Sequence, residues 1–242
     1  MIPTDALTMS CSDTRRFQTC AALFSLAALT TGCGGGGESP PPLPQTVACT
    51  SSPPAPAPAS SLQDPQVRLV FKNGLGVDGA VVLTLNRALA PLTVANFLAY
   101  VNSGFYNCTI LHRHAPSFVL QGGGYAAPVQ VGGTVPNPKP TRAPIVLEDL
   151  NGFSNARLTV AMARTEVANS ATSEFFINLA NNTRLDGSAT QLGYAVFGSV
   201  TTGEVVINSM TVAPCSFWTA LVASGECVPN PNIVLMSATQ TR

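Results

Sequence analysis

Residues 111–124, with the sequence LHRHAPSFVLQGGG, form the most informative stretch of the chain. Both histidines of the protein lie in this stretch, one on each side of Arg113. Apolar runs at 110–111 and 118–121 are typical of short strands, and Pro116 stands between them. The stretch therefore predicts two short strands joined by a turn, with a cation next to the turn.

Three other chemistries can be weighed against this pattern. Cys108, His112 and His114 are metal-ligating residue types, and on a strand the two histidines would share one face. Two histidines without a nearby carboxylate make a poor site, so no metal is expected. The glycines at 122–124 lack the lysine and the spacing of a phosphate-binding loop. The hydroxyl residues at 170–173 lie outside any GxSxG pattern, which leaves serine hydrolysis without support.

Similar strand-like runs recur along the rest of the chain, separated by glycine, asparagine and proline. They lie at 67–71, 80–85, 158–163, 174–179, 195–200 and 233–238. A helix is expected from an N-cap at Thr93 to Asn102, and a second short helix at 203–210. Many short strands with few helices predict a β-sandwich or a closed barrel, because closure removes exposed strand edges.

The stretch at 111–124 resembles the FHRxxPxFxxQGGD signature of cyclophilin-type peptidyl-prolyl cis-trans isomerases. Three further segments match the family in order and spacing: APLTVANFLAYVNSGFYNCT (90–109), TVAMARTEVANSATSEFFINLANNTRLD (159–186) and LGYAVFGSVTTGEVV (192–206). The resemblance covers residues 67–238. It implies a mainly β fold, a closed eight-stranded antiparallel β-barrel with two short helices, and isomerase activity without a cofactor.

The same resemblance implies roles for individual residues. Arg113 matches the catalytic arginine of the family, and Gln121 matches the glutamine that orients the arginine and the substrate. The resemblance further implies pocket walls at Phe118, Val119, Phe176 and Leu185, peptide-binding backbone at Ala163 and Arg164, and a position for histidine or tyrosine at Tyr194.

Among the departures from the family pattern, two bear on activity and ligand binding. Glu174 stands where glutamine is usual, and it is expected among the substrate-binding residues, close enough to Arg113 for its charge to compete for the guanidinium; whether this weakens activity stays open. A catalytically weak module that holds proline-containing segments in the same groove, for binding or assembly, is therefore the alternative function. Arg184 stands where an aromatic residue helps to bind cyclosporin, which leaves cyclosporin sensitivity open.

The chemistry required follows from the peptide bond itself. An X-Pro amide crosses a barrier of about 18–20 kcal/mol, because rotation breaks the C–N resonance. As the bond twists, the prolyl nitrogen gains a lone pair, and a fixed guanidinium hydrogen-bonds it better than it does the planar ground state. The expected partners are therefore proline-containing polypeptide chains, and a monomer is expected.

Composition excludes other partners. The chain has 242 residues and a formal net charge of zero, with 12 Lys plus Arg against 12 Asp plus Glu. With no excess of positive charge to neutralise phosphates, neither nucleic-acid binding nor a polybasic membrane surface is expected.

The N-terminal part is expected to carry export and anchoring signals. An uncharged apolar run at 19–31 follows two arginines and is too short to span a bilayer, which predicts a signal peptide at 1–32. The small residues before Cys33 resemble a bacterial lipobox, so lipidation of Cys33 is expected, with ordinary signal-peptidase cleavage nearby as the alternative. Residues 33–61 predict a Gly/Pro-rich tether and 62–242 the isomerase domain, which together indicate a periplasmic protein anchored to a bacterial membrane.

Four cysteines remain after Cys33, at 49, 108, 215 and 227, and an even number in an exported chain permits two disulfides. Cys215 and Cys227 enclose a short segment and are expected to staple a surface loop. A bond between Cys49 and Cys108 would then follow only by elimination. No pocket residue is expected between Cys215 and Cys227, so loss of that disulfide is expected to lower the melting temperature and leave turnover nearly intact.

Overall fold

The computed structural model describes residues 47–50 and 63–242. The expected signal peptide, Cys33 and most of the expected tether lie outside these residues. Among the helices of the described part, none is long and apolar enough to cross a membrane.

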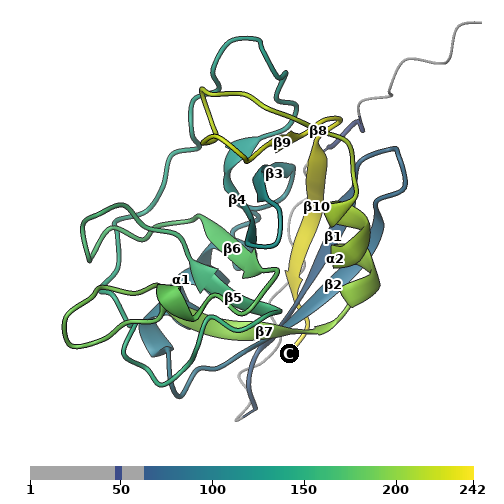
Figure 1. Ribbon diagram of the computed structural model, residues 1–242. Helices are drawn as coiled ribbons and strands as arrows, with labels where there is room; N and C mark the ends of the chain where they lie inside the picture. Colours follow the sequence, from purple (N-terminus) through teal and green to yellow (C-terminus); the bar gives the residue numbers. More distant parts are fainter. Residues whose placement is uncertain (1–46, 51–62) are drawn as a thin grey trace, which may run out of the picture. The chain divides into compact units, whose positions relative to one another are not determined.

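Eight antiparallel strands of the described chain close into a barrel, which confirms the predicted fold (Figure 1). The barrel strands are β1 (Gln66–Lys72), β2 (Asp78–Leu85), β3 (Thr109–Ala115), β4 (Val119–Ala126), β5 (Thr159–Met162), β6 (Phe175–Asn178), β7 (Val196–Thr202) and β10 (Ile233–Gln240). Around the barrel their order is β1-β10-β3-β4-β6-β5-β7-β2. Because β10 pairs with both β1 and β3, the end of the domain closes the barrel against its beginning.

Alternating burial explains why these segments form strands of a barrel. In β1, Val67, Leu69 and Phe71 are fully buried, whereas the residues between them are partly or fully exposed. β2 repeats the alternation along its second half, where every second side chain is buried. This period of two directs one face of each strand into the barrel interior and the other toward solvent.

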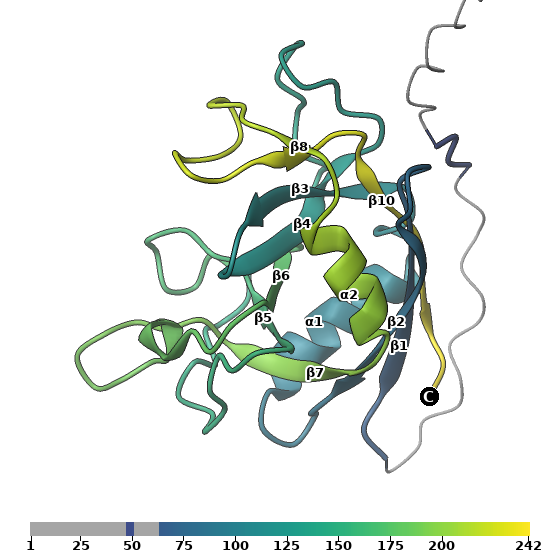
Figure 2. The same ribbon diagram turned by 45° about the vertical axis from the view of Figure 1, so that its right-hand side comes forward.

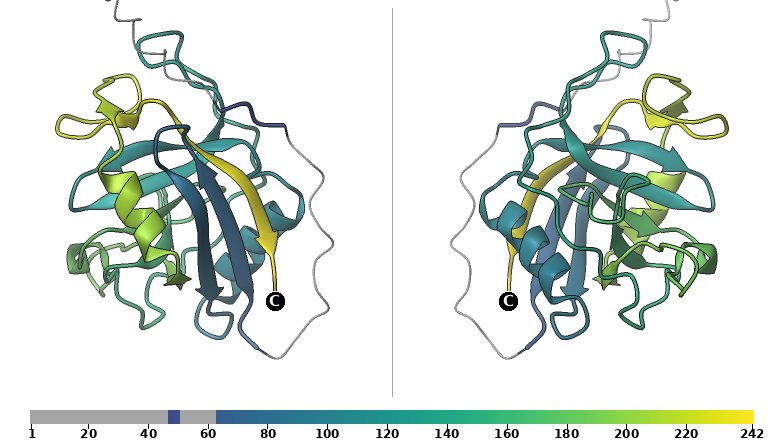
Figure 3. Two further views of the ribbon diagram at one scale, coloured as in Figure 1. Left: turned by 90° about the vertical axis from the view of Figure 1, so that its right-hand side faces the viewer. Right: turned by 90° about the vertical axis from the view of Figure 1, so that its left-hand side faces the viewer.

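Two α-helices and a 3₁₀ turn complete the domain within the described residues: α1 (Pro91–Asn102), α2 (Glu204–Thr211) and η1 (Thr183–Leu185). Figure 2 looks along the barrel, with α2 in front of the opening and α1 behind it. The side views of Figure 3 show the same two helices on opposite sides of the strands β1 and β2. The helices therefore cover the two ends of the barrel.

The barrel interior is filled by an aromatic cluster centred on Phe97 of α1. Its ring centroid lies 5.2 Å from that of Tyr106, 5.5 Å from Phe175 and 5.0 Å from Phe197. All four rings are fully buried. The cluster joins α1 to β6 and β7, so it supports the strand that carries Phe176.

The expected N-cap of the first helix is wrong. The helix begins at Pro91, and Thr93 is a buried residue of its first turn. The free N–H groups of this turn are satisfied from elsewhere in the chain, because Glu148 accepts hydrogen bonds from the backbone N–H of Leu92 (3.1 Å) and Thr93 (2.8 Å). The carboxylate of Glu148 thus caps the helix, although the sequence predicted that the hydroxyl of Thr93 would do so.

Two disulfides are present in the described residues, Cys49–Cys108 and Cys215–Cys227, each with a Cα–Cα distance of 5.6 Å. The second closes a loop between the short strands β8 (Cys215–Ser216) and β9 (Val228–Pro229), which pair with each other. This loop docks on β3 through two backbone hydrogen bonds between His114 and Cys227, of 2.8 and 2.9 Å. The loop therefore lies beside the strand that carries Arg113.

Candidate active site

Arg113 and Gln121 face each other across two neighbouring strands. Arg113 lies in β3 and pairs in register with Gln121 of β4, and opposite residues of an antiparallel pair project to the same face. Nη1 of Arg113 donates a hydrogen bond of 2.8 Å to Oε1 of Gln121. The strand register therefore brings the two residues together.

A pocket of about 290 Å³ lies in front of this pair. Its lining consists of Arg113, Phe118, Val119, Gln121, Ala163, Arg164, Phe176, Leu185 and Tyr194. These are the positions that the resemblance assigned to catalysis and substrate binding, except for Glu174. The barrel thus gathers residues from β3, β4, β6, η1 and three connecting segments around one cavity.

The pocket has an apolar side and a polar side. Phe176 is buried to all but 4% and meets the ring of Tyr194 edge-on, with 5.6 Å between centroids. Phe118 and Leu185 pack against the same apolar cluster. A small apolar ring would be desolvated on this side while its polar atoms face the guanidinium and amide opposite.

Two arginines stack on aromatic rings that line the pocket. The guanidinium of Arg184 lies 4.6 Å from the ring centroid of Phe118, and that of Arg164 lies 4.6 Å from the ring of Tyr194. Arg164 also donates hydrogen bonds to the backbone oxygens of Gly193 (2.7 Å) and Leu192 (2.9 Å). Its side chain is therefore held in place, a contact that the sequence did not indicate.

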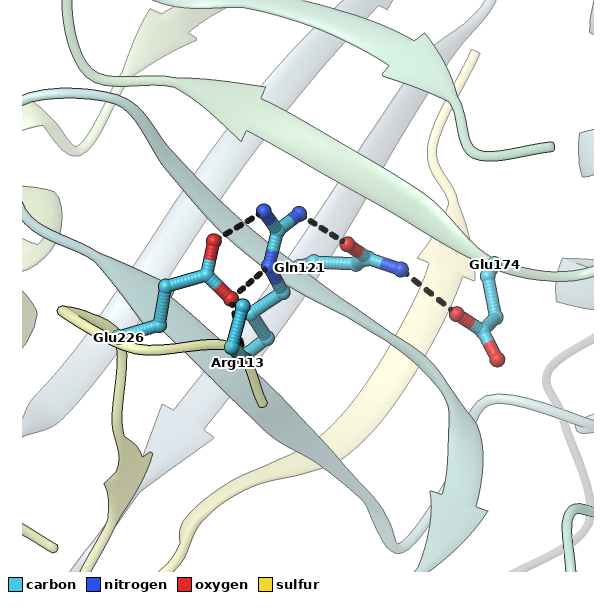
Figure 4. Close-up of polar contacts among 5 residues, drawn as sticks. Arg113, Gln121, Glu174 and Glu226 are labelled. Carbon is cyan, nitrogen blue, oxygen red and sulfur yellow. Dashed lines mark hydrogen bonds and ion pairs between the residues drawn. The ribbon is translucent and has the colours of Figure 1, made fainter. Parts of the chain in front are cut away.

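The expected competition of Glu174 for Arg113 is wrong. Glu174 accepts a hydrogen bond of 2.8 Å from Nε2 of Gln121 and lies 3.4 Å from Nε2 of His112. Figure 4 shows the side chain of Gln121 between the carboxylate and the arginine. Because a carboxylate only accepts, it orients the Gln121 amide so that the carbonyl oxygen faces Arg113.

The charge of Glu174 is stabilised in this position. Burial alone would raise the pKa of the carboxyl, but hydrogen bonds from His112 and Gln121, together with the charges of His112 and Arg113, outweigh burial and lower it from its ordinary value. The carboxylate therefore stays ionised near neutral pH and keeps the amide in one orientation.

The carboxylate that holds Arg113 is Glu226, a residue that the sequence analysis missed. Oε2 accepts a hydrogen bond of 2.7 Å from Nε of Arg113, and Oε1 accepts a second from Nη2 (Figure 4). Glu226 lies within the Cys215–Cys227 loop and does not line the pocket, but it bonds to a pocket residue, a contact that was not expected of this loop. One feature of the sequence could have indicated this residue: Glu226 is the single charged residue between the two cysteines.

Glu226 also gives a pH-dependent stability. Hydrogen bonds from Arg113 lower the pKa of Glu226 from its ordinary value of 4.5, although burial acts in the opposite direction. Its contribution should be complete above pH 4.5 and be lost as the pH falls through the lower pKa of the folded state, because the unfolded chain takes up the proton first. Chemical denaturation of the wild type and of Glu226→Gln across this range should give a shallower decline for the variant, and parallel curves would contradict the assignment.

Glu174→Gln should change kcat/KM by no more than about threefold. The substituted amide keeps an acceptor for Gln121, and both acceptors of Arg113 remain in place. An isomerisation assay on both proteins gives the ratio. A rise of about tenfold would show that the charge of Glu174 restrains Arg113 after all.

One group of metal-ligating side chains occurs within the described residues. The ligand atoms of His114, Cys215 and Cys227 lie within 4.8 Å of one another. Both sulfurs are bonded to each other in the disulfide, which leaves only the imidazole to bind a metal. This group therefore does not form a metal site in the oxidised protein.

Comparison with known proteins agrees with this geometry. Residues 70–239 match the family model described as cyclophilin type peptidyl-prolyl cis-trans isomerase/CLD. The chain is 42% identical over 160 residues to peptidyl-prolyl cis-trans isomerase A of Dickeya dadantii (strain 3937), covering 66% of this chain and 78% of that protein. It is 37% identical over 164 residues to peptidyl-prolyl cis-trans isomerase B of Escherichia coli (strain K12), covering 66% and 93%. A crystal structure of a cyclophilin-type isomerase of Cryptosporidium parvum has a similar fold, with a TM-score of 0.56, 21% identity and coverage of 74% of this chain and 98% of that one.

Proposed function

The chain belongs to the cyclophilin-type peptidyl-prolyl cis-trans isomerases, and from this we propose that Arg113 and the pocket in front of it isomerise X-Pro bonds of exported polypeptides. The observation that carries the assignment of residues is the position of Arg113. Its guanidinium lies in the wall of a pocket whose opposite side is apolar, and Gln121 fixes one of its nitrogens.

In the proposed reaction the proline ring enters the apolar side, against Phe118, Phe176 and Leu185. This contact holds the ring while the residue before it rotates about the C–N bond. The prolyl nitrogen loses its conjugation during the rotation and becomes a hydrogen-bond acceptor. An N–H of Arg113 then binds this nitrogen more strongly in the twisted state than in either planar state.

The energy required is within the reach of such a site. An acceleration of about 10⁵ corresponds to about 7 kcal/mol of additional binding in the transition state. A charge-assisted hydrogen bond in a desolvated pocket, together with positioning of the substrate, supplies a contribution of this size. The alternative of a catalytically weak binding module rested on Glu174, and Glu174 bonds to Gln121 rather than to Arg113.

The activity can be tested with the full chain and a short peptide containing an Ala-Pro bond. A protease that cleaves only the trans form reports the rate of isomerisation, and magnetisation exchange between the two isomers gives the same rate without a protease. The protein should accelerate isomerisation catalytically. Tight binding of the peptide without any acceleration would favour the binding-module function instead.

We propose further that the protein is exported, monomeric and anchored through a lipid on Cys33. Two features support export: the signal-like N-terminal sequence and the two disulfides of the described domain, since disulfides persist in oxidising compartments. Cys33 lies outside the described residues, so the support for its lipidation comes from the sequence alone.

Cys33→Ala should release the mature protein from membranes into the soluble fraction. A lipidated protein partitions into the detergent phase because acyl chains leave water, whereas the variant has no anchor. Phase partitioning and intact-mass measurement of both proteins give the answer. A mature wild-type chain without an added acyl mass would contradict the proposal.

A further inference from the structure

The loop closed by Cys215–Cys227 reaches the active site through one residue. Glu226 precedes Cys227, whose backbone is paired with His114 of β3, the neighbour of Arg113. A turn before it is closed by a hydrogen bond of 3.1 Å from the N–H of Glu226 to the oxygen of Ala223, and Gly225 adopts a positive φ of 85° inside it. The backbone around Glu226 is therefore fixed on both sides.

The side chain of Glu226 is fixed as well. Its carboxylate accepts from Nε and Nη2 of Arg113, and Oε2 also accepts from the backbone N–H of Ala223 at 3.1 Å. The side chains of Glu226 and Arg113 are 14% and 26% exposed, respectively. The pair differs from a surface ion pair, which is usually solvated and changes geometry freely.

The contacts of Arg113 show which of its donors remain for a substrate. A guanidinium has five N–H groups in one plane. Glu226 takes the Nε–H and one N–H of Nη2, and Gln121 takes one N–H of Nη1. One N–H therefore remains on each terminal nitrogen. Since Arg113 and Gln121 line the pocket and Glu226 does not, the carboxylate holds the guanidinium from outside the cavity.

We propose that Glu226 is a positioning residue for the isomerase reaction, which fixes the plane of the Arg113 guanidinium so that its remaining N–H groups face the prolyl nitrogen. This role rests on the proposed function of Arg113. Two effects of the carboxylate oppose each other: it partly neutralises the positive charge of the guanidinium, and it removes the need to order a flexible arginine in each turnover. Ordering an unpaired arginine side chain slows a reaction by about tenfold or more. This cost exceeds the loss in rate caused by the weaker charge of a guanidinium that stays paired throughout the reaction.

Glu226→Ala should therefore lower kcat by about tenfold and leave KM within about twofold, because the interaction acts in the transition state. The matched control is Glu204→Ala, which removes a Glu–Arg pair of similar type with Arg157 (2.7 Å), on the surface and outside the pocket. This control should retain wild-type kcat. Circular dichroism and thermal unfolding of each variant ensure that folded proteins are compared.

A double variant separates positioning from a merely structural effect. In the Arg113→Ala background, Glu226→Ala should cause no further loss of kcat, because its action passes through the guanidinium. A further loss of about tenfold would show that Glu226 acts through the fold, and a rise in kcat for Glu226→Ala alone would show that the carboxylate restrains the arginine; either result overturns the proposal. An inactive wild-type chain would refute the proposed function and this role together, whereas an active chain in which Glu226→Ala matches Glu204→Ala would refute the positioning role alone.

Discussion

Arg113→Ala should lower kcat/KM by about 10²-fold or more while peptide affinity changes far less. The proposed donor to the prolyl nitrogen is lost, and removal of a single donor of this kind typically costs a factor of about 10²–10³. The apolar side of the pocket remains intact, so the ground-state peptide still binds. Isomerisation assays and a separate measurement of peptide binding distinguish the two effects, and an equal loss in both would point to a binding role for Arg113.

Because Glu226 loses its partner in Arg113→Ala, the experiment needs a control for stability. In Arg113→Ala, Glu226 keeps a largely buried carboxylate without its cation, which destabilises the loop independently of catalysis. The double variant Arg113→Ala, Glu226→Ala removes both groups and should show the same low kcat/KM with restored stability. Arg113→Lys keeps a charge but cannot bond to two acceptors in one plane, so its activity should lie between the wild type and the alanine variant.

Phe97→Ala should lower the free energy of unfolding by about 3–5 kcal/mol. The ring is fully buried and contacts three other aromatic rings, so its removal leaves a cavity at the centre of the barrel. Small domains are stable by only about 5–15 kcal/mol, and the melting temperature should therefore fall by many degrees. Chemical denaturation with the disulfides intact measures the loss.

A matched aromatic residue shows whether the effect comes from the cluster. Phe105 packs at the edge of the core and is only partly buried, so Phe105→Ala should cost clearly less than Phe97→Ala. Since Phe97 does not line the pocket, the folded Phe97→Ala protein should retain most of its kcat/KM at low temperature. A loss of stability below about 1 kcal/mol would contradict the central place of this ring.

The parts of the site that were predictable depend on local patterns. Alternation of apolar residues predicted the strands, and the resemblance to the cyclophilin family assigned Arg113 and Gln121 to the site. The structure then pairs these two residues in register across β3 and β4. Contacts between distant segments were not predictable in the same way. Glu226 reaches Arg113 across 113 residues of sequence, and its position depends on how the loop docks on β3. Glu148 likewise replaces the expected helix cap from 55 residues away.

The case of Glu174 shows a second limit. The sequence predicted that Glu174 lies near the site. Its hydrogen-bond partner, however, depends on which side chain lies between its carboxylate and Arg113. Gln121 occupies that place and converts a supposed competition for Arg113 into a relay of hydrogen bonds. Residue types and spacing do not determine this order, because it is set by side-chain packing.

The Cys49–Cys108 disulfide changes what a protease can do to this protein. The bond spans 59 residues of sequence, a ring that contains β1, β2 and α1. A single cleavage anywhere inside this ring breaks the backbone but leaves one covalent molecule, which separates into two fragments on an electrophoresis gel only after reduction. A lipid on Cys33 would therefore remain joined to the barrel after such a cut. Release of the barrel from such an anchor would require cleavage between Cys33 and Cys49, or a reductant together with the protease.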